Sequence, residues 1–319
     1  MTTDPDSNYQ KTKSRALGLL GKGQAEAARE LLSAVLPEGS DDAELLFALG
    51  VANGMLGNYP DAEKSLRMAA GIAPGLAHVH YTLGKALKAQ DKLEAAVESL
   101  STACRMEPGN AAIRNDLCNT LLAHGQPREA LAHIQQATML APDNPDYHYN
   151  LGNVSGYLGL RDQAISAYQR AVALKPDFRS ARIALGDALL GAGELDAAIA
   201  TYKPVLAENP ADPGALVGMA AVLDKQGNFR EASDLLAPLL DAGRADAFAA
   251  ATFAGFSHHI DREDDAVRLA EQTLENPHLR ATERARLCFA LGRIHDRKGQ
   301  FDGAFRHYSA GNALRRSDF

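Results

Sequence analysis

Apolar residues between positions 145 and 178 recur every three or four places, in two stretches that flank a short break at Gly159. This spacing places the apolar residues of each stretch along one face of an α-helix. Pro176 ends the second stretch, because proline has no backbone N–H and its ring clashes with the preceding turn. The segment therefore predicts a helix, a turn and a second helix.

The same pattern returns with a constant period of 34 residues. Five units without an insertion run from Ala43 to Asp212. Their shared markers are Leu49-Gly50, Leu83-Gly84, Leu117-Cys118, Leu151-Gly152 and Leu185-Gly186, then Ala62, Ala96, Ala130, Ala164 and Ala198, then Pro74, Pro108, Pro142, Pro176 and Pro210. Because one such unit cannot bury its apolar face alone, the repetition predicts a solenoid in which neighbouring units share a continuous core.

Small residues occupy matched places in the two predicted helices of a unit, as Gly152 and Ala164 do in residues 145–178. We expect the two helix backbones to approach closely there. This pattern resembles the tetratricopeptide repeat over roughly residues 9–318. The resemblance implies an all-α fold, a right-handed superhelical solenoid of about nine helix-turn-helix repeats, with first helices lining a concave groove and second helices outside.

The register also predicts the organisation of the chain. We expect a disordered N-terminal tail at residues 1–8, repeats 1–7 at 9–246, a degenerate repeat 8 at 247–284 and repeat 9 at 285–319. Repeat 7 lacks its closing proline, since Arg244 stands there, and the alanine-rich segment that follows has weak markers. We therefore expect looser or tilted packing between residues 240 and 284. The markers of repeat 9 are displaced by four residues.

Charge and cysteine content narrow the classes of partner and the compartment. The formal charge of −7 argues against nucleic acid, because phosphate contacts need a concentrated basic surface. No apolar stretch has the length of a signal peptide or membrane helix, so we expect a cytoplasmic protein without membrane contact. Cys104, Cys118 and Cys288 have no metal-site spacing and are interpreted as buried packing residues.

Recognised catalytic and phosphate-binding motifs are absent from the sequence, so we expect neither enzymatic activity nor a cofactor in this chain. The adjacent pair His258 and His259 does not favour a metal site, because neighbouring residues on an α-helix point about a hundred degrees apart. Carboxylates grouped at predicted helix starts, as in Asp41-Asp42 and in residues 263–265, are interpreted as caps.

The concave groove would be lined by the second, fifth, ninth, twelfth and thirteenth positions of each repeat. Asparagine carries both a donor and an acceptor and can hold a peptide backbone, while tyrosine adds apolar contact. The alternative is that these polar residues are an ordinary helix surface and the aromatic residues pack between repeats. The predicted peptide-binding residues are Tyr81, Lys85, Lys88, Asn115, Asn119, Tyr149, Asn150, Asn153, Tyr157 and Asp187.

Two subclasses of the family suggest different ligands for this groove. Asn119 and Asn150 match the two asparagine places of repeats that hold the C-terminal carboxylate of heat-shock chaperones. The basic places of that clamp are occupied by Asn115, Ser180 and Ala184, so we expect it to be absent. Residues 145–178 also resemble the repeats that precede O-linked N-acetylglucosamine transferases, in which an asparagine ladder holds peptides; only Asn150 matches the strict ladder position.

The last repeat is rich in basic residues. They are Arg284, Arg286, Arg293, Arg297, Lys298, Arg306, Arg315 and Arg316. Arg286, Arg293 and Arg297 are predicted to contact an anionic partner or an adjoining domain; the alternative is a solvated face paired with Asp296 and Asp302. Residues 286–316 resemble the final repeat of bacterial proteins that continue into a sulfotransferase domain, which would make this chain a substrate-recruiting arm.

The sequence therefore leaves three hypotheses open. The leading one is a protein-interaction scaffold that binds an extended peptide or protein in the groove. The second is the substrate-recruiting arm of a sulfotransferase whose catalytic domain would follow Phe319. The third is a self-association module that forms a homodimer.

Overall fold

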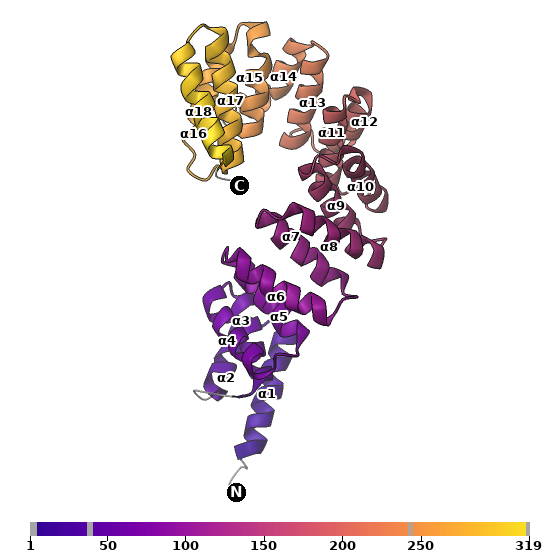
Figure 1. Cartoon of the computed structure of the whole chain (residues 1–319), viewed down its shortest axis with the longest axis vertical. Coiled ribbons are helices and arrows are strands. Elements are labelled where there is room, and N and C mark those ends of the chain that lie inside the picture. Colours follow the sequence, from indigo (N-terminus) through magenta and orange to yellow (C-terminus); the bar gives the residue numbers. More distant parts are fainter. Residues whose placement is uncertain (1–4, 37–40, 242, 244, 317–319) are drawn as a thin grey trace. The chain divides into compact units, whose positions relative to one another are not determined.

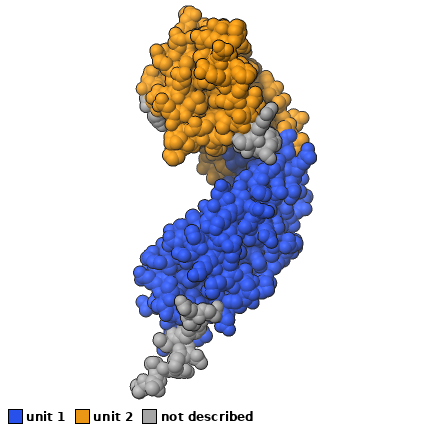
Figure 2. All heavy atoms as spheres, turned by 60° about the vertical axis from the view of Figure 1, so that its left-hand side comes forward, with its two compact units in different colours: residues 1–158 blue, residues 159–319 orange. Residues whose placement is uncertain are grey.

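The computed structural model describes residues 5–36, 41–241, 243 and 245–316. This part of the chain contains eighteen α-helices, one short 3-10 helix and no strand (Figure 1). The helices divide between two compact units, Met1–Leu158 and Gly159–Phe319 (Figure 2). The expected all-α solenoid of helix pairs is confirmed.

Each unit contains nine of the α-helices. The first unit has α1 (Pro5–Gly21), α2 (Ala25–Val35), α3 (Ala43–Met55), α4 (Tyr59–Ile72), α5 (Ala77–Ala89), α6 (Leu93–Met106), α7 (Ala111–Ala123), α8 (Pro127–Leu140) and α9 (Pro145–Tyr157). The second has α10 (Arg161–Leu174), α11 (Arg179–Ala192), α12 (Leu195–Glu208), α13 (Pro213–Lys225), α14 (Phe229–Asp241), α15 (Ala247–Phe256), the 3-10 helix η1 (Ser257–Ile260), α16 (Glu263–Leu274), α17 (Ala281–Arg297) and α18 (Phe301–Arg316).

Five of the first helices begin at side-chain caps that keep the 34-residue register, whereas α5 and α11 have no side-chain cap. The caps are Asp42, Asn110, Asn144, Asp212 and Asp246, and each side chain accepts a hydrogen bond from a backbone N–H of the following turn. Such caps satisfy donors that the helix itself leaves unpaired. The turn between the two helices of a repeat needs a left-handed residue, which is Gly125 in repeat 4 (φ 77°) and Asp91 in repeat 3 (φ 59°).

Small residues bring the paired helices together, as the sequence predicted. A Cβ added to Gly84 of α5 would lie 2.6 Å from Cγ of Leu100 in α6. Leu100 is fully buried, and Ala96, one turn earlier, is too. Any side chain at position 84 would therefore push the two helices apart.

First helices also contact one another in series within each unit. In the first unit α3 contacts α5, α5 contacts α7 and α7 contacts α9. Ile113 and Leu117 of α7 and Ile134 of α8 contribute to one apolar core. All three cysteines are buried and unpaired, which confirms their interpretation as packing residues.

The N-terminal helix begins earlier than expected. α1 starts at Pro5, inside the segment predicted as a disordered tail, and residues 1–4 lie outside the described part. Proline is compatible with a helix start, because a first-turn N–H has no partner within the helix. The helical part of repeat 1 thus extends upstream of Tyr9.

Repeat 8 is tightly packed, which contradicts the expected looseness. Its first helix, α15, has only 10 residues, yet Phe253 and Phe256 are buried with ring centroids 5.7 Å apart. Leu291 and Ile294 of α17 belong to the same core cluster. The two phenylalanines supply the volume that the surrounding alanines lack, a compensation that marker residues do not reveal.

The displaced register of repeat 9 has a simple structural cause. Its first helix, α17, has 17 residues, whereas α3, for example, has 13. The additional turn precedes Leu291-Gly292, so the two markers fall four residues late. Gly292 still meets the second helix, because its added Cβ would lie 2.6 Å from Cε1 of Tyr308.

Candidate functional site

Nine of the ten predicted groove residues lie on three consecutive first helices of the first unit. Tyr81, Lys85 and Lys88 are on α5, Asn115 and Asn119 on α7, and Tyr149, Asn150, Asn153 and Tyr157 on α9. Because these helices contact one another in series, the nine residues belong to one row of helices. We call this set of nine residues the asparagine–tyrosine surface. The tenth residue, Asp187, lies on α11 of the second unit.

Tyr81 links two of these helices. Its hydroxyl donates a hydrogen bond of 2.6 Å to Oδ2 of Asp116 on α7, and Nζ of Lys85 lies 5.2 Å from its ring centroid. Burial, together with the hydrogen bond to Asp116 and the charge of that carboxylate, raises the pKa of the Tyr81 hydroxyl well above its usual value. The Tyr81 hydroxyl therefore stays protonated and holds α5 against α7.

An asparagine pair makes the corresponding link one repeat later. Nδ2 of Asn150 on α9 donates a hydrogen bond of 2.7 Å to Oδ1 of Asn115 on α7. An amide has two donors and an acceptor with two lone pairs, so this single bond leaves both side chains with further capacity. Asn119 and Asn153 are half-buried, whereas 59% of Tyr157 is exposed.

Asp187 is engaged by a tyrosine of its own repeat. The hydroxyl of Tyr202 on α12 donates a hydrogen bond of 2.6 Å to Oδ1 of Asp187. Burial, with the charge and the hydrogen bond of Asp187, raises the pKa of the Tyr202 hydroxyl far above its usual value. Asp187 thus belongs to the packing of repeat 6 as well as to its surface.

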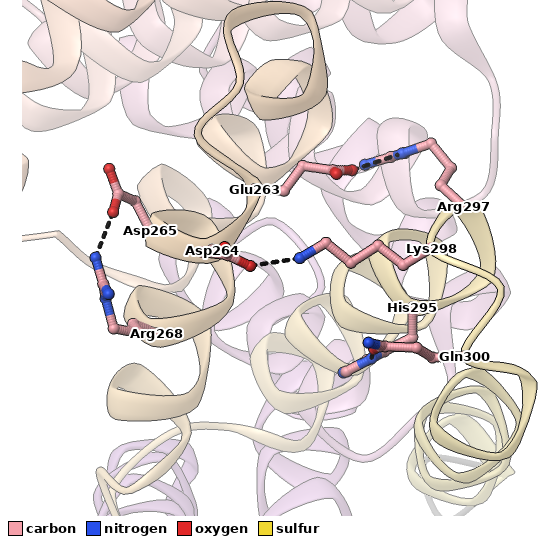
Figure 3. Close-up of polar contacts among 8 residues, drawn as sticks. All are labelled: Glu263, Asp264, Asp265, Arg268, His295, Arg297, Lys298 and Gln300. Atoms are coloured by element: carbon pink, nitrogen blue, oxygen red, sulfur yellow. Dashed lines mark hydrogen bonds and ion pairs between the residues drawn. The ribbon is translucent and has the colours of Figure 1, made fainter.

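The basic residues of the last repeat separate into two groups. Arg297, the last residue of α17, pairs with Glu263 through a 3.1 Å contact, and Lys298, the C-cap residue that follows, pairs with Asp264; both carboxylates lie at the start of α16 (Figure 3). The partners are thus carboxylates of the preceding repeat, not the predicted Asp296 and Asp302. This part of the basic segment joins repeats 8 and 9.

Arg286 and Arg293 form the second group. They line a cavity of about 460 Å³ together with Arg315. The side chain of Arg316 lies outside the described residues. Two of the three predicted basic contacts, Arg286 and Arg293, therefore share one cavity, while Arg297 is paired elsewhere.

Both acidic clusters lie at helix starts, as expected, but only Asp42 acts as a side-chain cap. Asp42 caps α3 by accepting a 3.0 Å hydrogen bond from the N–H of Leu45. Residues 263–265 instead lie within the first turn of α16, whose N-cap is Arg262, and make ion pairs with basic side chains. Asp265 pairs with Arg268 within that helix (Figure 3).

The two adjacent histidines lie close to each other and to an aromatic ring. His258 and His259 lie in the 3-10 helix η1, and their ring centroids are 3.8 Å apart. His259 also stacks on Phe229 at 3.8 Å. Burial and the charge of Arg297 lower the pKa of His258. Within the described residues there is no group of three or more His, Cys, Asp or Glu side chains placed to hold a metal ion.

Two family models match the chain, and both describe the tetratricopeptide repeat. One matches residues 87–152 and 189–253, and the other matches residues 14–77 and 156–213. Together they cover most of the helix pairs. The chain is built of tetratricopeptide repeats.

Several solved tetratricopeptide structures are similar to part of this chain. The MamA protein is 24% identical, covering 53% of this chain and 92% of its own, with a TM-score of 0.50. MamA AMB-1 is 22% identical, covering 54% and 94%, with a TM-score of 0.50. YrrB, described as a TPR protein with an unusual peptide-binding site, is 22% identical, covering 53% and 88%, with a TM-score of 0.49. A comparison with curated proteins found no match.

Tetratricopeptide repeat proteins generally mediate contacts between proteins, so the candidate partner is a protein or peptide. Across the described helices, none combines the length and the apolar composition needed to cross a membrane. On the described helices, most of the polar site residues predicted from sequence lie at two places, the asparagine–tyrosine surface and the arginine-lined cavity.

Proposed function

We propose that the chain is an interaction scaffold whose asparagine–tyrosine surface binds an extended peptide segment of a partner protein. The observation that carries this proposal is the continuity of the surface, since amide and phenol side chains lie on α5, α7 and α9, which contact one another in series. An extended peptide repeats its N–H and C=O groups regularly. A row of side chains that both donate and accept can follow it.

Recognition would rest chiefly on asparagines. Asn119 and Asn153 can donate to peptide carbonyls and accept from peptide N–H groups, each bond contributing about 0.5–1.5 kcal/mol net. Tyr157, with 59% of its surface exposed, offers an aromatic face with few rotatable bonds to immobilise on binding. This combination favours binding that depends more on the peptide backbone than on its side chains.

Hydrogen bonds already present would limit the cost of binding. The Tyr81–Asp116 and Asn150–Asn115 bonds join α5 to α7 and α7 to α9, so the helices that carry the surface are held together before a peptide arrives. Side chains fixed in advance lose less conformational entropy when they bind. Packing between repeats and peptide binding are therefore functions of different residues in this surface. Tyr81 packs between repeats, whereas Asn119 and Asn153 are the proposed peptide contacts.

Replacing Asn119→Ala together with Asn153→Ala is expected to weaken peptide binding roughly 5- to 150-fold, because two net hydrogen bonds are lost. The peptides would be selected on the wild-type chain from a random twelve-residue phage library and titrated by fluorescence anisotropy.

The matched control is Gln136→Ala, an exposed amide on the second helix α8. It should leave the affinity unchanged, and circular dichroism should show equal helix content for all three proteins. Equal affinities of the wild type and the double variant would remove the assignment.

Self-association is a second candidate, favoured by one observation. Phe301 and Phe305 lie one turn apart on α18 with 69% and 73% of their surfaces exposed. Exposed aromatic side chains of this kind commonly mark interaction surfaces. A molar mass that stays monomeric in light scattering over a dilution series would exclude this candidate. Recruitment of a substrate for a sulfotransferase domain stays a prediction from the resemblance of residues 286–316.

A further inference from the structure

Three arginines converge on a cavity between the last repeats of the second unit. The cavity measures about 460 Å³ and lies among α15, α17 and α18. Its polar and aromatic lining consists of Thr252, Thr282, Arg286, Phe289, Arg293 and Arg315. Two hydroxyl groups and three guanidinium groups make this lining rich in hydrogen-bond donors and positive in charge.

These arginines lack acidic partners among the described residues. Arg297 and Lys298, at the end of α17, form ion pairs, whereas Arg286, Arg293 and Arg315 form none in the described part of the chain. Arg286 lies 4.2 Å from the ring centroid of Phe248, and Arg315 lies 5.0 Å from that of Phe289. The rings position the guanidinium groups without neutralising them.

The charges of Arg286 and Arg315 act on each other at this cavity. Burial is the main cause of a lowered pKa of the Arg286 guanidinium, and the nearby charge of Arg315 acts in the same direction. Asp187, Asp246 and Glu283 act in the opposite direction without outweighing burial. An arginine guanidinium is not deprotonated in proteins, so Arg286 carries its positive charge. An anion between Arg286 and Arg315 would remove part of their mutual repulsion.

A second cavity adjoins the first. It measures about 440 Å³, and Thr252 and Arg286 line both cavities. Its walls come from α11, α13, α15 and α17 and are mainly apolar. They include Ile183, Leu190, Val217 and Phe248. The carboxylates of Asp187 and Asp246 lie at the same cavity, so it differs from its neighbour in both polarity and charge.

We propose that the two cavities together bind a short peptide segment of a partner protein in which an acidic side chain follows or precedes an aliphatic one. The carboxylate would lie against Arg286, Arg293 and Arg315, and the aliphatic side chain would enter the cavity lined by Ile183 and Val217. Guanidinium groups bind carboxylates in a planar, two-bonded geometry. This site lies in the second unit, goes beyond the asparagine–tyrosine surface and does not depend on it.

The charges at the two cavities also determine which cavity accepts the acidic side chain. A carboxylate placed at the apolar cavity would meet Asp187 and Asp246, and like charges at short distance repel. Acidic residues are therefore accepted at the arginine end only. A peptide with carboxylates at both ends should bind less well than one with a single acidic end, although it carries more negative charge.

The test uses a fluorescein-labelled peptide that contains Leu-Gly-Glu-Glu between Gly-Ser flanks, titrated with the full chain in low salt and followed by anisotropy. Arg293→Gln with Arg315→Gln is expected to weaken binding about tenfold or more, because charge-assisted hydrogen bonds are lost. The matched control Arg268→Gln removes one positive charge from α16. Because 76% of the Arg268 side chain is exposed and exposed charges interact weakly, this variant should change the affinity less than twofold.

Peptide variants test the two cavities separately. Replacing both glutamates by glutamine should weaken binding about as much as the arginine substitutions, and replacing leucine by serine should weaken it independently of them. The Asn119→Ala, Asn153→Ala protein should bind this peptide as the wild type does, which distinguishes the two proposed sites. Equal binding of the glutamate and glutamine peptides, equal binding by the arginine variant, or no binding by the wild type at millimolar concentration would each overturn the proposal.

Discussion

Replacing Tyr202→Ala is expected to lower the free energy of unfolding of the second unit by about 3–5 kcal/mol, the range for removing a large buried aromatic side chain. Tyr202 on α12 is fully buried. Its ring lies against Gly186 of α11 and Gly218 of α13, where an added Cβ would collide with ring atoms. The ring therefore fills a space to which three helices contribute, and its loss leaves a cavity that the neighbouring glycines cannot fill.

The two glycines make this explanation specific. Gly218→Ala alone should destabilise the wild-type protein by about 1–3 kcal/mol, because the new methyl group overlaps the Tyr202 ring. In the Tyr202→Ala protein the same change should cost little, since the obstructing ring is gone. Denaturant unfolding followed by circular dichroism measures all four proteins of this cycle.

Tyr202→Phe is the matched control. It keeps the ring and removes the 2.6 Å hydrogen bond to Asp187, so a loss of only about 1 kcal/mol is expected. A phenylalanine variant as unstable as the alanine variant would show that the hydroxyl, not the ring, carries the stability. Additive effects of Tyr202→Ala and Gly218→Ala would also contradict the packing explanation.

Asp212→Asn should destabilise the protein at neutral pH by about 1 kcal/mol, because asparagine keeps the cap but loses the ion pair with the half-exposed Arg179, and this difference should shrink in acid. Asp212 is fully buried, accepts a 3.0 Å hydrogen bond from the N–H of Ala215 and pairs with Arg179. Burial alone would raise its pKa, but the hydrogen bonds from Arg179 and Ala215 and the charge of Arg179 outweigh burial. The folded-state pKa of Asp212 is therefore below its usual 3.8.

The direction of the pH effect follows from this lowered pKa. The unfolded chain binds a proton at Asp212 more readily than the folded chain does, so the carboxylate stabilises the fold above its unfolded pKa. That contribution disappears as the pH falls through the lower folded pKa. The difference in unfolding free energy between the wild type and Asp212→Asn should therefore be smaller near pH 3 than at pH 7.

A second cap provides the control for this measurement. Asp246 caps α15 by accepting hydrogen bonds of 2.9 and 2.8 Å from the N–H groups of Phe248 and Ala249, and it forms no ion pair in the described part of the chain. Because asparagine can also accept these hydrogen bonds, Asp246→Asn isolates the contribution of the negative charge at a cap that has no ion pair. If Asp212→Asn costs no more than Asp246→Asn at pH 7, the pair with Arg179 adds nothing to stability.

The repeated elements of the fold could be predicted from sequence because each marker has a local cause. Gly84 is small because Leu100 of the paired helix lies against it, and Gly125 supplies a left-handed turn residue. Asp91 performs the same function as Gly125 in repeat 3, a substitution that a search for glycine passes over. Asn110 and Asn144, which cap α7 and α9, occupy the same place in the register, although they were not among the repeat markers predicted from the sequence.

The remaining features depend on neighbours that one repeat does not contain. The partner of Arg297 is Glu263 in the preceding repeat, and nothing in the local sequence distinguishes Arg297 from Arg293. Phe289 and Thr252, which complete the arginine-lined cavity, come from different helices and carry no repeat signature. Helical periodicity likewise does not predict the 3-10 helix that contains His258 and His259.

Site-specific photocrosslinking tests the proposed peptide contact most directly. Tyr157 on α9 would be replaced by p-benzoylphenylalanine, which its 59% exposed position can accommodate, and the exposed Met139 on α8 would be replaced in a second protein. Irradiation with a labelled phage-selected peptide is expected to crosslink the peptide at position 157 and not at position 139. Crosslinking at position 139 with none at position 157 would show that the peptide binds the second helices and would contradict the account.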